Sequence, residues 1–158
     1  MNTTKGGSAK QALGIATRYF EAMSKRDGPV MAALRGPNFE FDLVYRDASG
    51  TGAPSVSGAD SYYRALFEAF SGLDFECTRI VAADTVAVVE WTFVGNNTGP
   101  VAPLLPGEVD LPVPSGRTVT LRGVTVLDIV SGAISRETIY TDQATLLVEL
   151  GSGAGTGQ

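Results

Sequence analysis

The stretch RTVTLRGVTVLDIVSGAISRETIYT, residues 117–141, decides the fold class of the chain. Apolar and polar residues alternate along both of its halves, which is typical of β-strands that bury one face. Ser131-Gly132 separates the halves and has the composition of a two-residue hairpin loop. The stretch therefore predicts two long antiparallel strands, 117–130 and 133–141, joined by a tight turn.

Further strands and helices are predicted on both sides of this hairpin. Alternation predicts strands at 75–83 and 85–94, and an earlier strand, 39–45, has an aromatic face. Apolar residues at helical spacing predict the first helix, whose stripe is Leu13, Ala16, Phe20 and Met23. The remaining predicted helices are 30–34, 59–70 and a last one from Asp142 to Gly151.

The order of these elements predicts an α+β fold. Most helices precede a run of four antiparallel strands, which favours helices packed on one face of an antiparallel sheet. A strongly curved sheet closed by N-terminal helices forms a cone. We expect a ligand pocket at its wide end.

A single domain is predicted over residues 9–151. The length of 158 residues suits one domain with a modest core. Residues 1–8 and 152–158 are rich in Gly, Ser and Thr, so we expect both to be disordered tails. The loop from Pro100 to Pro114 is long and rich in proline, and we expect it to cover the pocket or to extend a dimer contact.

The composition excludes several classes of function. Without histidine, the chain cannot form a Ser-His-Asp triad or bind a metal through imidazole, and one cysteine excludes an intrachain disulfide. The net charge of −5 comes without a basic cluster, so no nucleic-acid partner is expected. No apolar run approaches the roughly 20 residues of a membrane helix, and residues 1–10 lack the core of a signal peptide. We therefore expect a cytoplasmic protein without membrane contact.

Side-chain parity assigns the inner face of the cone. Trp91 and Phe93 are expected inside, and Cys77 shares a strand face with Phe75, which favours a buried, inert thiol over a nucleophile. The side chains of strand 117–130 form two alternating sets, and we expect the more apolar set to lie inside. It consists of Val119, Leu121, Gly123, Thr125 and Leu127.

Glu137 shares a strand face with Ile139 and has two interpretations. If it points into the cone, burial would raise the pKa of its carboxyl group and suit it to act as a general base. If it lies near the mouth of the cone, it faces solvent or pairs with Arg122 or Arg136.

Asp142 stands where the last strand gives way to the last helix. Asp at that place is typical of a helix N-cap, and the alternative is a catalytic carboxylate. Tyrosine hydroxyls could also donate a hydrogen bond to a substrate carbonyl, or simply lie at the surface of a packed ring. The tyrosines considered for this are Tyr45, Tyr62, Tyr63 and Tyr140.

Three pieces of sequence, in order, resemble one known family. They are Gly95-Asn96-Asn97-Thr98-Gly99, then Pro114-Ser115-Gly116-Arg117, and then Ser131-Gly132-Ala133-Ile134 with the later Asp142 and Glu149-Leu150-Gly151. Together they resemble the SnoaL-like polyketide cyclases of the NTF2-like superfamily over about residues 9–151. The resemblance implies an NTF2-like cone with a deep apolar pocket, a homodimer, no cofactor and a polyketide-like small-molecule substrate.

This sequence departs from the acid–base residues of that family, whose cyclases close rings by intramolecular aldol condensation. Ile139 occupies the position of the family's catalytic Asp, Thr125 that of an assisting His, and Asn97 that of the His in its Gly-Thr-His-Thr-Gly motif. The pocket that the resemblance implies is lined by Met23, Phe41, Ala65, Trp91, Phe93, Asn97, Thr125, Ile139 and Tyr140.

We therefore expect a cofactor-independent cyclase that folds its substrate for ring closure, with cycloaddition as one such reaction. Glu137, Tyr45 and Asp142 are the candidates to polarise a substrate carbonyl. One alternative is an isomerase or dehydratase in which Glu137 is the base. Another is a non-catalytic protein that binds an apolar metabolite.

Overall fold

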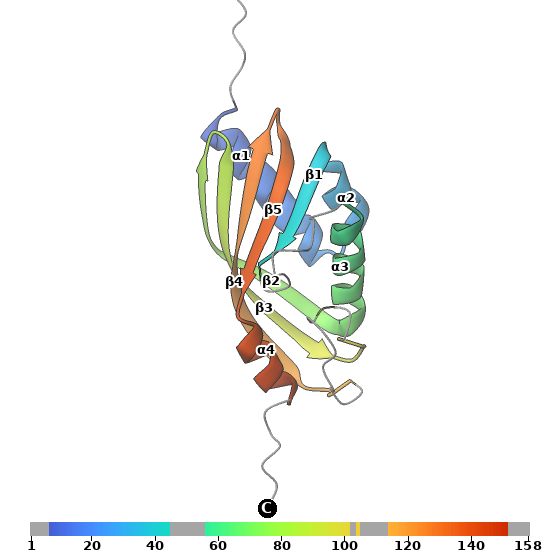
Figure 1. The fold of residues 1–158 in the computed structure, drawn as a ribbon. Coiled ribbons are helices and arrows are strands. Elements are labelled where there is room, and N and C mark those ends of the chain that lie inside the picture. Colours follow the sequence, from blue (N-terminus) through green and yellow to red (C-terminus); the bar gives the residue numbers. More distant parts are fainter. Residues whose placement is uncertain (1–6, 45–55, 102–103, 105–113, 152–158) are drawn as a thin grey trace, which may run out of the picture.

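The computed structural model describes residues 7–44, 56–101, 104 and 114–151 (Figure 1). The predicted tails lie almost wholly outside these residues, as do Tyr45 and most of the proline-rich loop. The helices are α1 (Ala9–Ser24), α2 (Gly28–Ala33), α3 (Val56–Ala69) and α4 (Gln143–Leu150). The strands are β1 (Arg35–Leu43), β2 (Phe70–Ala83), β3 (Val86–Asn97), β4 (Thr118–Val130) and β5 (Ala133–Thr141).

The hairpin that decided the fold class forms as predicted. β4 and β5 pair in antiparallel fashion up to Val130 and Ala133. Ser131 and Gly132 both have positive φ, 51° and 77°, which is the backbone of the turn that matches the twist of a hairpin. β2 and β3 continue the antiparallel pairing on the far side of β4, so the predicted run of four antiparallel strands is confirmed.

The sequence predicts an antiparallel sheet, and the pairing of β1 differs from that prediction. β1 pairs with β5 in parallel. The sheet order is β1-β5-β4-β3-β2, so β1 and β2 form opposite edges of a mixed sheet. The chain passes from one edge to the other through α3. Alternation specifies which face of a strand is buried, but not which strand becomes its neighbour.

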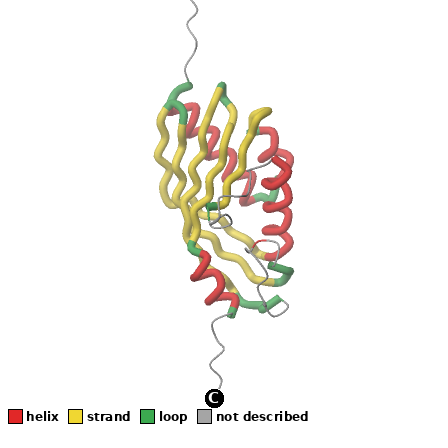
Figure 2. The backbone as a smooth tube through the Cα atoms, in the orientation of Figure 1, coloured by secondary structure: helices red, strands yellow, loops and turns green. Residues whose placement is uncertain are grey.

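The helices gather on one side of the curved sheet, where α1 contacts β2 and β3 and α3 contacts β1 and β2 (Figure 2). α4 instead contacts β4 at the far end of the molecule (Figure 1). This arrangement confirms the predicted α+β fold, a curved sheet closed by N-terminal helices. Within the ranges that the structure describes, no helix is long and apolar enough to span a membrane.

Three of the four residues of the predicted α1 stripe, Ala16, Phe20 and Met23, are buried. Leu13 is 42% exposed, so its predicted burial is wrong. Ala12 takes its place, and the buried face continues through Ile15, Tyr19 and Met23. Ser8 caps the helix by accepting from the backbone N–H of Gln11.

Candidate functional site

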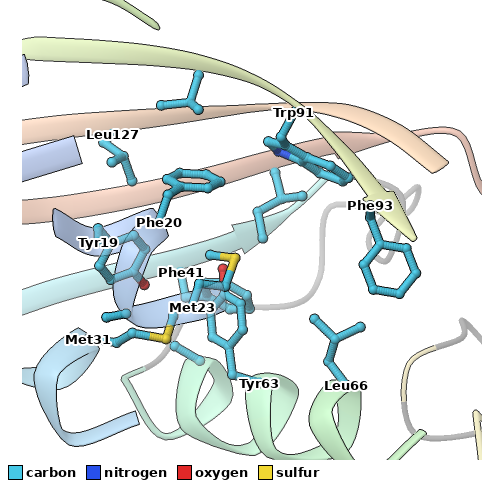
Figure 3. Packing of buried hydrophobic residues seen from close by; sticks show 14 of the residues in the cluster. Tyr19, Phe20, Met23, Met31, Phe41, Tyr63, Leu66, Trp91, Phe93 and Leu127 are labelled. Carbon is cyan, nitrogen blue, oxygen red and sulfur yellow. The ribbon is translucent and has the colours of Figure 1, made fainter. Parts of the chain in front are cut away.

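An apolar cavity lies between the curved sheet and the helices α1, α3 and α4. It has an empty volume of about 550 Å³, which includes space open to solvent, and it is narrow between its walls. Figure 3 shows several of its wall residues pointing toward one another from α1, α3 and β3. The lining is Phe20, Met23, Tyr62, Tyr63, Leu66, Phe70, Phe75, Trp91, Phe93, Leu104, Leu121, Thr125, Ile139, Thr141, Gln143 and Leu146.

Five of the residues proposed for the pocket line this cavity. They are Met23, Trp91, Phe93, Thr125 and Ile139, and each lies on the inner face of its helix or strand. On β4, Leu121 and Thr125 are buried together with Val119 and Leu127, as the parity of that strand predicts.

The other four residues proposed for the pocket are not part of its described lining. Phe41 is buried but packs against the rings of Tyr62 and Tyr63, with centroids 5.4 and 6.1 Å away. Ala65 is half-buried on α3 beside the core. Tyr140 is 49% exposed, because it alternates with the inward-facing Ile139 and so points away from the cone.

Asn97, the fourth of these, holds the loop that follows β3. Its amide nitrogen donates to the carbonyls of Ala69 and Gly99, at 3.2 and 2.9 Å. Its amide oxygen accepts from the backbone N–H of Ser115 at 2.7 Å and from the Ser115 hydroxyl at 3.0 Å. The described hydrogen bonds of this buried amide therefore hold the backbone around the loop in place.

Gly123 fixes the position of the Trp91 indole in the cavity wall. A β-carbon at Gly123 would overlap the six-membered ring of Trp91, so the ring lies directly across this glycine. The indole N–H then donates to the Thr125 hydroxyl at 2.9 Å, which satisfies both groups in a buried place. The absence of a side chain at position 123 is thus a requirement of the cavity wall.

Gly123→Ala is therefore expected to displace the indole and to lower the free energy of unfolding by about 1–3 kcal/mol. Because Trp91 is the only tryptophan, its fluorescence emission should shift to longer wavelength, and urea unfolding gives the stability. Gly14→Ala is the matched control, since a β-carbon there meets nothing within 4 Å and alanine favours the exposed α1 position. Unchanged emission and stability in Gly123→Ala would show that the indole does not depend on Gly123.

Glu137 points into the protein and not to solvent. It is 0% exposed, and its two carboxylate oxygens accept hydrogen bonds from the hydroxyl of Tyr19, at 2.6 Å, and from that of Tyr63. The Tyr19 hydroxyl accepts in turn from the Arg35 guanidinium, at 2.8 and 3.1 Å. Arg136, one of the partners considered for Glu137, pairs instead with Glu40 and Asp42.

Burial governs the protonation of this cluster of Glu137, Tyr19, Tyr63 and Arg35. Loss of hydration raises the pKa of Glu137, although the two phenols and Arg35 oppose that effect. Burial, followed by the negative charge of Glu137, raises the pKa of both Tyr19 and Tyr63 well above the usual range. The phenols therefore stay protonated and act as donors to the carboxylate.

The cluster joins four elements behind the cavity wall. Tyr19 lies on α1, Arg35 on β1, Tyr63 on α3 and Glu137 on β5. Tyr63 is the one member that lines the cavity, and its hydroxyl is turned back toward Glu137. Because both carboxylate oxygens already accept hydrogen bonds, the arrangement is suited to holding the walls of the cone together.

Asp142 caps α4. Its carboxylate accepts from the backbone N–H and the hydroxyl of Thr145, at 3.0 and 2.6 Å, and these bonds lower the pKa of the exposed carboxyl group. The side chain is not part of the described cavity lining. The geometry therefore fits the capping interpretation of Asp142 and gives no support for a catalytic carboxylate.

Replacing Asp142 with alanine is expected to lower the melting temperature by about 2–4 °C and to leave the chemistry of the cavity unchanged. The reason is that one capping side chain of a short helix is lost while the cavity keeps its lining. Thermal unfolding and a ligand titration on the same sample check both parts. A variant that melts normally but no longer binds ligand or turns it over would assign Asp142 to the site.

Sequence reasoning missed two polar residues of the cavity, Thr141 and Gln143. Both line it, and among the described residues the Thr141 hydroxyl and the Gln143 amide oxygen are the buried side-chain polar atoms that lack a hydrogen-bond partner. Thr141 shares the strand parity of Glu137 and Ile139, which could have placed it on the inner face. Nothing in the sequence signals Gln143, because the predicted cap at Asp142 gives the start of α4 but not which of its side chains face the cavity.

Cys77 is not part of the described cavity lining. Cys77 is half-buried, and burial raises the pKa of its thiol, which disfavours the reactive thiolate. Across residues 7–44, 56–101, 104 and 114–151, no three His, Cys, Asp or Glu side chains come together as a metal site would require.

Comparison with known proteins relates this chain to one family. The sequence matches the SnoaL-like domain family over residues 16–137, and no curated protein matches it significantly. AclR from Streptomyces galilaeus, assigned as a hydroxylase, is 17% identical, with a TM-score of 0.77 over 92% of this chain and 98% of its own. A protein from Jannaschia sp. CCS1, assigned as a SnoaL-like polyketide cyclase, is 18% identical, with a TM-score of 0.74 over 95% of this chain and 96% of its own.

An NTF2-like protein from Burkholderia thailandensis is 20% identical, with a TM-score of 0.63 over 85% of this chain and 92% of its own. Likeness at these identities shows a shared NTF2-like fold, while the family match covers most of the sequence. That match establishes that the chain belongs to the SnoaL-like domain family.

Proposed function

We propose that this protein is a natural-product cyclase that folds a flexible, polyketide-like substrate for intramolecular ring closure. One observation carries the proposal: the described cavity lining is apolar and aromatic, and its polar side chains are only threonine, glutamine and tyrosine. None of these groups is ionised near neutral pH. Such a lining can orient a chain and donate hydrogen bonds to it, but it offers no carboxylate or amine to exchange protons directly.

Ring closure of the cycloaddition type fits this lining best. In a cycloaddition, π electrons of a diene and an alkene within one substrate become two new carbon–carbon σ bonds, so no proton or leaving group departs. The protein can accelerate such a step by holding the two reacting ends close together. The flexible chain then no longer has to lose conformational entropy in order to reach the reactive arrangement during the reaction. The neutral donors of the wall can also polarise a carbonyl that is conjugated to the alkene.

A second candidate is an isomerase or dehydratase in which Glu137 is the base. The observation that favours it is the hydrogen bond from Tyr63, a lining residue, to Glu137. In that scheme, Tyr63 takes a proton from a substrate carbon while its own proton passes to Glu137. The pair then returns a proton to another carbon in the isomerase, or to the departing hydroxyl, which leaves as water, in the dehydratase. The raised pKa of Tyr63 disfavours loss of its proton as a separate step. It is compatible with a concerted transfer, in which the hydroxyl gains one proton as it gives up another.

The test uses linear polyketide-like chains that carry a conjugated diene and an activated alkene at several spacings. The purified protein is expected to convert at least one of them, faster than buffer does, to a single stereoisomer of unchanged mass. A product that has lost water would support the dehydratase. Tight binding of the chains without any acceleration would contradict the cyclase and leave a metabolite-binding protein.

A further inference from the structure

Two unsatisfied polar groups mark one end of the cavity. A buried polar atom without a hydrogen bond costs about 1–3 kcal/mol, and folded proteins retain few of them. Within the described part of the chain, the two such side-chain atoms are Thr141 Oγ1 and Gln143 Oε1, and both residues line this one cavity. Thr125, the other threonine of the lining, is already satisfied by Trp91.

The fold places these two groups at the junction of β5 and α4. Thr141 ends β5, and Gln143 begins α4. Asp142 lies between them, and its carboxylate accepts a hydrogen bond from Thr145. Asp142 is not part of the described cavity lining. In the sheet, Thr141 pairs with Gly123, which has no side chain to cover it and over which the Trp91 indole lies. The polar end is therefore bordered by an aromatic wall.

We infer that Thr141 and Gln143 form a hydroxyl-recognition end of the cavity, and that its ligand carries an alcohol, enol or phenol there. This inference rests on the proposed function, since it assumes that the cavity binds a small molecule. The Gln143 oxygen only accepts hydrogen bonds, whereas the Thr141 hydroxyl both donates and accepts. A ligand hydroxyl can donate to Gln143 and accept from Thr141, while a carbonyl can satisfy Thr141 alone.

A cationic ligand group fits this end less well. An ammonium could donate to the Gln143 oxygen, but the described lining supplies no carboxylate to balance its charge in a largely apolar cavity. A neutral group that donates and accepts at one atom satisfies both residues without that cost. In a polyketide-like chain, the group of this kind is a hydroxyl.

The experiment compares 2-naphthol with 2-fluoronaphthalene, which is similar in size but has no hydrogen-bond donor. Isothermal titration calorimetry of the full chain is expected to give about tenfold tighter binding of 2-naphthol. The double variant Thr141→Val with Gln143→Met keeps the volume of the wall and should bind both probes equally. Thr120→Val is the matched control, since Thr120 is exposed on the outer face of β4, and it should keep the tenfold preference.

The outcomes separate this inference from the proposed function. Equal affinity of the wild-type protein for the two probes would overturn the hydroxyl-recognition end and leave the cavity as a binding site. Failure of both probes to bind would overturn the inference together with the proposed function. Because the wild-type ratio alone decides between these results, the test does not depend on the double variant folding well.

Discussion

Glu137→Ala is expected to lower the free energy of unfolding by about 3–5 kcal/mol, the largest stability effect of any single change considered. The substitution leaves the hydroxyls of Tyr19 and Tyr63 without their acceptor in a fully buried place. It also removes a negative charge that interacts with the nearly buried Arg35, which keeps its ion pair with the exposed Asp60. Urea unfolding followed by Trp91 fluorescence measures the loss.

Glu90→Ala is the matched control for Glu137→Ala. Glu90 pairs with Arg79 at 2.5 Å on the surface, where its side chain is 40% exposed. Exposed ion pairs are typically worth less than about 1 kcal/mol. If Glu137→Ala were as mild as this control, the buried cluster would not be what joins α1, α3 and β5.

The pH dependence of the isosteric variant Glu137→Gln tests the same carboxyl group. Burial raises its pKa in the folded protein above the value of about 4.5 of an unperturbed glutamate. The folded state then holds the proton more tightly, so the stabilisation that the shift supplies is complete below pH 4.5 and is lost as the pH rises through the folded pKa. Wild type should therefore lose stability relative to Glu137→Gln across that interval, and unfolding at a series of pH values measures the difference. A relative gain would contradict a raised pKa.

Leu121→Trp is expected to reduce ring closure by about a hundredfold or more while the protein still folds. Leu121 lies on β4 and lines the cavity, so an indole there occupies the space that the substrate needs. Loss of the aligned conformation removes the acceleration that positioning supplies. The extra volume should cost about 1–3 kcal/mol of stability, which a protein of ordinary stability tolerates.

Thr120→Trp controls for the cost of placing an indole on β4. Thr120 precedes Leu121 and is exposed on the outer face of the strand, so the same side chain there leaves the cavity empty. Turnover by this control should stay near that of wild type. Full activity in Leu121→Trp, with the fold retained, would mean that the reaction does not occur in this cavity.

Much of the fold followed from local patterns of sequence. The Ser131-Gly132 turn and the alternation on its two sides predict β4, β5 and the inner face of β4 correctly, because these depend on neighbours along the chain. The parallel pairing of β1 with β5 could not be predicted in this way, since it depends on contacts between strands that are far apart in the sequence.

The candidate site was less accessible to sequence reasoning, for a physical reason. Strand parity placed Trp91 and Thr125 inside, but the hydrogen bonds of Glu137 come from Tyr19 and Tyr63, which are 118 and 74 residues away. No spacing rule connects such residues. Asp142 was easier, because an N-cap acts within one turn of its own helix.

Ring closure is expected to depend on the shape of the cavity and not on Glu137 as a base. The most direct measurement is the rate of ring closure by Glu137→Gln, on a chain that wild type converts, after correction for the folded fraction. The expected rate lies within about tenfold of wild type, because the amide preserves the size of the side chain behind Tyr63. A loss of about a hundredfold or more, with the cavity still binding the chain, would contradict it and assign the proton transfer to Glu137.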